Sequence, residues 1–382
     1  MSGPLDGLLV ADFSRVLAGP YATQTLGDLG AEVIKVERPQ VGDDTRGWGP
    51  PFAGERSTYY LAVNRNKRSV VLDLGDEQQR RDAVELATRA DVVIHNFRAD
   101  GAERHGLGYD KLRRSNPGLV YCAVSAFGPG DRDGLPGYDF LAQAMGGLMS
   151  ITGQPDGEPT KVGVALVDVI TGMNAAIGVL AALRDRERTG VGRRVEVDLL
   201  SSVLAATVNQ VSGYLNTGQV PTRLGNQHPS VAPYESFETA DETLALAVGN
   251  DAQFARLCAV LGRPGLAEDE RFATNQARVA SRDELRAHLA AAFAERGRDD
   301  WIARLREVDV PCGPVNDLAE AVALAEAVGA EPVVTFEHAD GEVTRGLASP
   351  VRLDGEGVAY RRPPPELDEH GEEIRAWLRR PR

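Results

Sequence analysis

Short apolar runs alternate with amphipathic segments along the first half of the chain. Between the runs at 8–13 and 31–36, Pro20 and Gly30 stand where a helix would begin and end, because proline is favoured in a first turn and glycine just beyond a last one. Strands separated by helices predict an α/β fold with a parallel sheet covered on both faces. The predicted strands are 8–13, 31–36, 69–74, 91–94, 119–124 and 194–199, with further helices expected over 77–90 and from 199 to about 215.

The pattern changes at 216–233, where Gly, Pro, Asn and Gln are frequent, and we place a domain crossing there. Two apolar runs then flank a polar turn and predict a β-hairpin over 234–248. Helical patterns follow, so 216–329 is expected to form a smaller α+β domain beside a large domain over 1–215. The expected helices lie near 251–262, 281–296 and 298–307, with a surface helix over 318–331 and a terminal helix after Pro363-Pro364-Pro365.

Composition narrows the possible functions. The 382 residues carry 42 Lys and Arg against 56 Asp and Glu, a net charge of -14, which argues against a nucleic-acid-binding protein. A few placed arginines could still hold an anionic small ligand. Cys122, Cys258 and Cys312 form no metal-binding pattern, so we expect no metal site and a reduced, cytoplasmic protein. The N-terminus lacks a basic start followed by an apolar core, so we expect no signal peptide.

The longest apolar stretch, 162–183, carries a single charge, Asp168. Such a length also suits a membrane span. Three glycines, Thr171, Asn174 and the acid itself, with no aromatic belt, favour instead a buried strand or turn followed by a core helix. We therefore expect no association with a membrane.

Asp168 is the strongest candidate for chemistry. A carboxylate in apolar surroundings is costly unless it is paired, hydrogen-bonded or used in a reaction. Its place at the start of a helical pattern fits an N-cap, which would bind the first free amides. The functional alternative is a nucleophile or an acid–base partner, since an ionised carboxylate in a dry pocket can attack a reactive acyl carbon and form an anhydride.

Other candidates each have a structural alternative. His228 lies in a Gly/Pro-rich loop and could line a cleft or belong to a turn. Asn96 and Arg38 each follow a predicted strand, at the end where ligands gather in open α/β sheets, but they could also be a cap and a solvated arginine. Tyr138 fits either a site or the core. Neither a GxxxxGK[ST] loop nor a GxGxxG motif is present, so the sequence carries no ATP or NAD signal.

Several motifs together resemble the class III CoA-transferase family, also called the CaiB/BaiF family, which includes formyl-CoA transferases and α-methylacyl-CoA racemases. The resemblance covers nearly the whole chain. The motifs are DFSRVLAGP at 12–20, LGAEVIKVERP at 29–39, GDDTRG at 42–47, NRNKRS at 64–69, NF at 96–97, HPSVAPY at 228–234, GNDAQF at 249–254 and PCGPV at 311–315.

This resemblance implies a particular architecture. The large domain would be Rossmann-like and built from both chain ends, so that 330–382 return to 1–215, while the small domain comes from the middle. Two subunits would interlock, with the active site between domains. Such a homodimer is obligate, because folding and assembly cannot be separated in it.

The resemblance also assigns the chemistry. Asp168 matches a catalytic aspartate that attacks an acyl-CoA thioester, forms an aspartyl-acyl anhydride and then an aspartyl-CoA thioester, and passes CoA to a free carboxylic acid. Acyl-CoA is then a substrate, and no permanently bound cofactor is implied. Leu17 stands where formyl-CoA:oxalate enzymes carry Gln, so oxalate is not the expected acceptor. Tyr138 and His228 would join Leu17 in the substrate pocket, and the residues matched to CoA binding are Val16, Ala18, Arg38, Leu72, Asn96, Phe97 and Arg104.

The main alternative within the same fold is a 2-methylacyl-CoA racemase or epimerase. Those enzymes carry His where Tyr138 stands. Removing an α proton from one face and returning it to the other needs two groups that titrate near neutral pH. Tyrosine, with a reference pKa of about 10, is a poor substitute for His, so the sequence favours a transferase.

Overall fold

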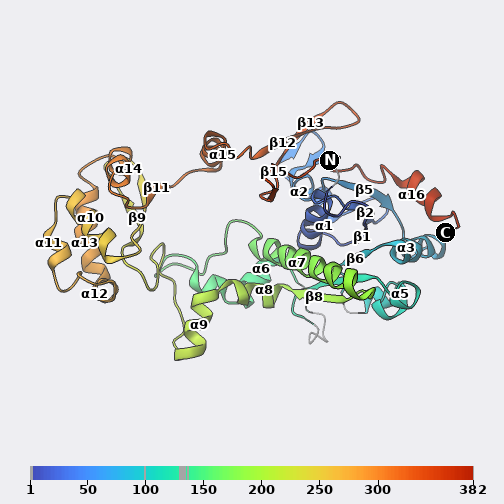
Figure 1. Cartoon of the computed structure of the whole chain (residues 1–382), viewed down its shortest axis with the longest axis horizontal. Helices are drawn as coiled ribbons and strands as arrows, with labels where there is room; N and C mark the ends of the chain where they lie inside the picture. Colours follow the sequence, from blue (N-terminus) through green and yellow to red (C-terminus); the bar gives the residue numbers. More distant parts are fainter. Residues whose placement is uncertain (1–2, 99, 129–134, 136, 382) are drawn as a thin grey trace. The chain divides into compact units, whose positions relative to one another are not determined.

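A computed structural model of the chain describes residues 3–98, 100–128, 135 and 137–381. The chain divides into two compact units (Figure 1). The first comprises 1–148, 162–217 and 330–382, and the second comprises 149–161 and 218–329. The sequence had placed 149–161 in the large domain, so the chain makes two more crossings between the units than we expected.

The first unit is built on a six-stranded sheet in which every neighbouring pair is parallel. The order is β5-β2-β1-β6-β7-β8, so successive strands run outward in opposite directions from the junction of β1 and β6. Such a reversal leaves a crevice at the carboxyl ends of the strands, where ligands bind in open α/β sheets. The strands are β1 (Leu9–Phe13), β2 (Glu32–Glu37), β5 (Lys67–Val71), β6 (Val92–His95), β7 (Val120–Ser125) and β8 (Arg194–Asp198).

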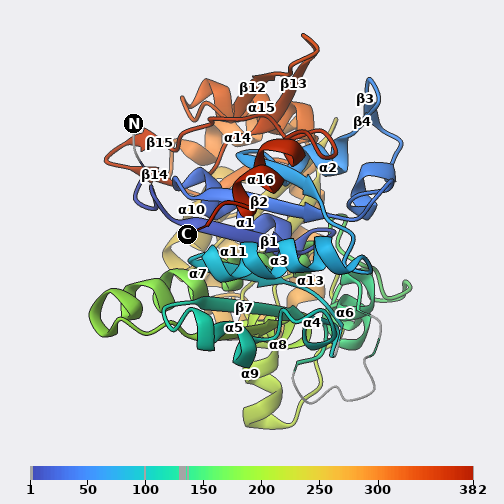
Figure 2. The same ribbon diagram turned by 90° about the vertical axis from the view of Figure 1, so that its right-hand side faces the viewer.

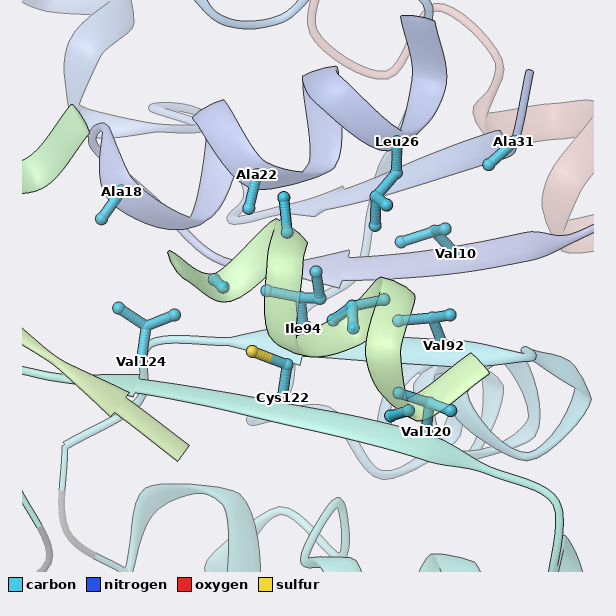
Figure 3. Packing of buried hydrophobic residues seen from close by; sticks show 14 of the residues in the cluster. Val10, Ala18, Ala22, Leu26, Ala31, Val92, Ile94, Val120, Cys122 and Val124 are labelled. Atoms are coloured by element: carbon cyan, nitrogen blue, oxygen red, sulfur yellow. The ribbon is translucent and has the colours of Figure 1, made fainter. Parts of the chain in front are cut away.

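Helices α1 (Ala18–Asp28) and α7 (Leu166–Thr189) lie together on one face of this sheet. Apolar side chains from β1, β6 and β7 fill the space beneath them, including Val10, Ile94 and Val120 (Figure 3). The two helices approach closely at Gly172, where an added Cβ would stand 2.6 Å from the carbonyl oxygen of Ala18. Glycine is therefore required there, and this contact fixes the start of α7 against α1.

The opposite face of the sheet is covered by α3 (Glu77–Arg89), α5 (Tyr109–Ser115) and the C-terminal helix α16 (Gly371–Leu378) (Figure 2). The segment before α16 is tied to the start of β5 by Asn66. Its side chain donates to the carbonyl of Ala359 at 2.9 Å and accepts from the N–H of Arg361 at 2.7 Å. The last 50 residues therefore complete the first unit.

Opposite charges are buried together behind the carboxyl ends of the strands. Lys67 lies at the start of β5 and is fully buried, with its Nζ 3.2 Å from Asp12 Oδ2 and 2.9 Å from Asn64 Oδ1. Lys35 on β2 is equally buried and pairs with Asp43 at 2.8 Å. Removing any one of these charges would leave its partner uncompensated in a dry environment.

The second unit has its own antiparallel sheet of β9 (Tyr234–Glu238), β10 (Thr243–Ala247) and β11 (Cys312–Pro314). The expected hairpin is present as β9 and β10, whereas β11 was not predicted. The helices that pack on this sheet bury an aromatic cluster of Phe237, Phe293 and Trp301. These helices are α10 (Asp251–Val260), α11 (Gly265–Glu268), α12 (Asn275–Ala280), α13 (Arg282–Phe293) and α14 (Arg298–Arg306).

In the part of the chain that the structure describes, one helix, α7, has the length and apolar composition to cross a membrane. Half of its apolar window is buried inside the protein, against α1 and the sheet, as in the core helix of a soluble protein.

The remaining elements are short: α2 (Thr58–Ala62), α4 (Gly101–Arg104), α6 (Asp139–Met145), α8 (Leu199–Ala206), α9 (Val208–Thr217), α15 (Leu318–Ala327), the hairpins β3 (Phe52–Ala53) with β4 (Arg56–Ser57), β12 (Val333–Glu337) with β13 (Val343–Leu347) and β14 (Arg352–Leu353) with β15 (Glu356–Gly357), and the 3₁₀ turns Asp44–Gly47 and Leu148–Ile151.

Candidate active site

A cavity of about 710 Å³ lies within the first unit, at the carboxyl ends of its strands. Its walls come from the loop between β1 and α1, from the ends of β6 and β7, from β8 and from the start of α7. Asp168 is one of the lining residues. The others that matter below are Arg15, Val16, Leu17, Ala18, Asp44, His95, Asn96, Phe97 and Tyr138.

Asp168 is the third residue of α7, and Ala165 occupies the N-cap position without a side-chain hydrogen bond. The N-cap interpretation of Asp168 is therefore wrong: its carboxylate is free of the helix amides. Only 9% of the residue is exposed. Burial, and then the negative charge of Asp139, raise the pKa of Asp168 from 3.8 to about 7. The site therefore holds a carboxylate that is more basic than an ordinary aspartate and about half ionised at neutral pH.

The role expected of Asp168 at the helix terminus belongs to Asp139, on the neighbouring helix α6. Asp139 Oδ1 accepts the main-chain N–H of Val167 at 2.8 Å and that of Asp168 at 3.0 Å. Gln143 donates to the other oxygen, Oδ2, at 2.6 Å. Sequence reasoning assigned no role to either residue, although Asp139 directly follows Tyr138.

Aromatic residues surround the carboxylate. Tyr138 lines the cavity and is 55% exposed, so it is not a core tyrosine. Leu17 is buried and also faces the cavity. Burial, followed by the charges of Asp168 and Asp139, raises the pKa of Tyr59 to about 12, so this phenol stays neutral beside the carboxylates. The sequence did not single out Tyr59, whose ring packs edge-on against Trp48 with 5.2 Å between centroids.

A second cavity, of about 300 Å³, adjoins the first, and Arg15 and Phe97 line both. It contains Arg38 and Leu72, two of the residues matched to CoA binding. Asp44 pairs with both guanidinium groups, at 2.9 Å from Arg15 and 2.6 Å from Arg38. The larger cavity thus contains the carboxylate of Asp168, the smaller one contains Arg38, and Arg15 lines both.

The loop between β1 and α1 separates the two cavities and is held in a strained form. Val16 has φ of +71°, a left-handed conformation that a β-branched residue rarely adopts. Its N–H is held by Asp43 Oδ1 at 3.2 Å. Asn96 accepts the N–H of Arg15 at 3.0 Å and donates to its carbonyl at 2.8 Å. Asn96 thus fixes the main chain of this loop, a role that the sequence did not suggest.

The residues matched to CoA binding are distributed between the two cavities. Val16, Ala18, Asn96 and Phe97 line the larger one, and Arg38, Leu72 and Phe97 line the smaller one. Arg104 ends the short helix α4, is exposed and lines neither cavity.

His228 belongs to the second unit. Its ring packs against Tyr234 with 5.3 Å between centroids, and its Nδ1 accepts the N–H of Ser230 at 3.1 Å. Within that unit it therefore orders the loop before β9.

Among the described residues, no group of three or more His, Cys, Asp or Glu side chains is arranged to hold a metal ion. All three cysteines carry free thiols. The chemistry of the cavity thus depends on its carboxylates, phenols and guanidinium groups.

Comparison with known proteins gives a consistent result. The profile described as "CoA-transferase family III" matches residues 5–371. The chain is 44% identical to a succinate–glutarate CoA-transferase of Agrobacterium fabrum, over 98% of this chain and 96% of that protein, and 40% identical to an acetyl-CoA:oxalate CoA-transferase of Acetobacter aceti, over 98% and 95%. A crystal structure of a CaiB/BaiF family protein from Brucella suis superposes with a TM-score of 0.86 at 44% identity, covering 99% of this chain and all of that one.

Proposed function

This chain belongs to CoA-transferase family III, and from that premise we propose that it moves CoA from an acyl-CoA thioester to a free carboxylic acid through covalent intermediates on Asp168. The observation that carries the proposal is the buried carboxylate with a pKa of about 7 at the floor of a cavity that adjoins an arginine-bearing one.

The proposed reaction begins when a carboxylate oxygen of Asp168 attacks the thioester carbonyl carbon. The carbon–sulfur bond breaks, leaving an aspartyl-acyl anhydride and CoA thiolate. The thiolate then attacks Cγ of Asp168, releasing the donor acid as a carboxylate and forming an aspartyl-CoA thioester. The acceptor carboxylate attacks that thioester, and the two steps run in reverse to give the new acyl-CoA and free Asp168. The activated bond is conserved throughout, so no ATP is required.

The surroundings of Asp168 suit this chemistry in two ways. Its raised pKa makes the carboxylate a better nucleophile than an ordinary aspartate while leaving a large ionised fraction at neutral pH. Its burial limits access of water, which would hydrolyse the anhydride.

We further propose how acyl-CoA lies in the site. The nucleotide end would occupy the smaller cavity, where Arg38 and Leu72 line the wall and Arg15 lies at the junction. Guanidinium groups suit phosphates and stack on purine rings. The pantetheine arm would pass Phe97, which lines both cavities, and bring the thioester to Asp168. Arg104 and His228 line neither cavity, so they would contact acyl-CoA only where it extends beyond the two cavities.

The proposed substrates are acyl-CoA and carboxylate pairs of the dicarboxylic type, since the relative at 44% identity is named for succinate and glutarate. Leu17 stands where formyl-CoA:oxalate enzymes carry Gln, and this difference argued against oxalate as the acceptor. A relative at 40% identity is nevertheless named for that acid. Oxalate therefore belongs in the substrate panel. We propose that the protein acts in the cytoplasm as an interlocked homodimer, without a membrane or nucleic-acid partner.

The decisive test is intact-protein mass spectrometry after mixing with succinyl-CoA or acetyl-CoA. We expect wild-type protein to gain the mass of CoA less one water, as an aspartyl-CoA thioester requires, and Asp168→Ala to gain none. Incubation in deuterium oxide without an acceptor acid tests the racemase alternative. Exchange at the α carbon of 2-methylacyl-CoA, with no protein adduct from any thioester, would replace the transferase proposal.

We expect Arg38→Ala to weaken binding of CoA by about tenfold, because one charge-assisted contact to a phosphate contributes roughly 1.5 kcal/mol or more. Adduct formation at saturating acyl-CoA should be close to that of the wild type, since Arg38 is remote from the reacting atoms. Calorimetric titration with CoA measures the first effect. Arg184→Ala removes an exposed, ion-paired arginine far from both cavities and is the matched control. Equal affinities of the two variants would contradict the proposed orientation.

A further inference from the structure

Building on the proposed function, we propose that Asp139 is a positioning residue for the transfer reaction: it fixes the first turn of α7 through two main-chain amides and places a second carboxylate beside Asp168, whose charge strengthens Asp168 as a nucleophile.

The geometry makes Asp139 the anchor of the segment that carries Asp168. Its Oδ1 accepts the N–H groups of Val167 and Asp168, two of the amides that have no partner inside α7. Asp139 itself is only 8% exposed and sits in the first turn of α6. A carboxylate 29 residues away therefore does the capping, which leaves the carboxylate of Asp168 available for reaction.

Asp139 and Gln143, which lies one turn further along α6, together form a clamp on residues 162–168. It is fully buried, and its Nε2 donates to Asp139 Oδ2 at 2.6 Å. Its Oε1 accepts the N–H of Val162 at 2.8 Å, and its Nε2 also contacts the carbonyl of Val164 at 3.3 Å. The loop from 162 to 168 is thus held at both ends by two side chains on one face of a neighbouring helix.

Among the described residues, no cation forms an ion pair that would cancel the charge of Asp139. In the described ranges 3–98, 100–128 and 137–381, no Lys or Arg forms an ion pair with Asp139 or with Asp168. The titratable groups presented to Asp168 are Asp139 from α6 and Tyr59 from α2, while α1 presents Tyr21 one turn further along α7 at Gly172. Helix α8 carries no ionisable side chain, and the other charged or titratable residues of the cavity are Arg15, Asp44, His95, Arg98, Asp100, Glu103, Tyr109, Tyr121, Tyr138, Arg194, Glu196 and Asp198.

This arrangement has a chemical consequence. A like charge close by disfavours ionisation of Asp168, and it acts in the same direction as burial, the larger cause of the raised pKa. The electron pair on the Asp168 oxygen is therefore more basic, which favours attack on a thioester carbon. Asp139 itself takes no part in bond making, because it accepts hydrogen bonds only from groups that do not react.

The test compares the pH dependence of CoA-adduct formation in wild-type protein and Asp139→Asn, between pH 5.5 and 8.5, with succinyl-CoA. Asparagine keeps an oxygen for the two amides but removes the charge. We expect half-maximal rates near pH 7 in the wild type and about one pH unit lower in Asp139→Asn, with a lower plateau because the nucleophile is weaker. Gln143→Ala keeps the charge and loosens the clamp, so its rate should fall while its midpoint stays near pH 7.

Asp139→Asn loses its hydrogen bond from Gln143, so a second variant protects the test against misfolding. Combining Asp139→Asn with Gln143→Glu restores a donor–acceptor pair between the two side chains and moves the charge one turn away. Its midpoint should also lie below that of the wild type. An unchanged midpoint in both folded variants, whatever their rates, would overturn the proposal. Absence of an adduct in the wild type itself would instead overturn the proposed function, and the Asp168→Ala comparison separates the two failures.

Discussion

Asp168→Ala is expected to lower the rate of CoA transfer by about 10⁴-fold or more, while CoA binds within about twofold of its wild-type affinity. The variant removes the proposed nucleophile, so neither of the proposed covalent intermediates could form. The contacts proposed for the nucleotide and the pantetheine arm involve Arg38 and Phe97, which the substitution does not touch. Steady-state transfer between succinyl-CoA and glutarate, together with calorimetric titration of CoA, measures both quantities.

The melting temperature of Asp168→Ala provides the control against misfolding of this variant. The pKa of Asp168 is raised on folding, so the unfolded chain loses its proton at lower pH than the folded one, and this residue lowers stability as pH rises from about 4 through about 7. Asp168→Ala should therefore melt at the same temperature as the wild type or higher at pH 7.5. A lost activity with a lower melting temperature would point to misfolding, and retained transfer would exclude Asp168 as the nucleophile.

The largest effect on stability is expected from Lys67→Ala. This substitution leaves Asp12 fully buried without its closest cation, and breaking a buried pair from one side costs about 3–5 kcal/mol. Lys35 and the hydroxyl of Thr23, which donates to Asp12 at 2.6 Å, provide only partial compensation. Denaturant unfolding followed by circular dichroism measures the loss in free energy.

Arg81→Ala is the matched comparison, since it also breaks one ion pair of a cation with a carboxylate. Its partner Glu77 lies one turn away on the exposed surface of α3, where such a pair contributes no more than about 0.5 kcal/mol. A similar loss of stability in Arg81→Ala and Lys67→Ala would show that burial of the Lys67 pair has no special energetic weight.

Apolar runs located the strands because a parallel sheet covered on both faces needs almost continuous apolar residues. The exception is β5, which begins at Lys67, two residues before the expected start. The strand opens with Lys67 and Arg68, which lie outside the apolar run by which it was recognised. The charge of Lys67 is compensated by Asp12, 55 residues away, a pairing that no local pattern contains.

The candidate site, like the fold, was predicted only in part from the sequence. A single acid in an apolar stretch was enough to select Asp168, because such a residue is costly without a use. Its place at the start of a helix is confirmed, but the N-cap alternative is wrong, since the amides that it would have capped are bound by Asp139 from another helix. Tyr59, Asp139 and Gln143 gave no signal because their importance comes from where the fold places them beside α7. The two extra crossings on either side of 149–161 were missed for a related reason, since membership of a unit depends on contacts distant in sequence.

The dependence of the first unit on the last 50 residues has a consequence for its synthesis. While the middle of the chain is still being translated, the face of the sheet that α16 covers, including the pocket for Ile374 and Leu378, stays open to the cell. At roughly 5–20 residues per second this exposure lasts on the order of tens of seconds. A premature stop just before α16 would therefore produce a protein that keeps Asp168 but has an unsealed core, which quality-control proteases would recognise.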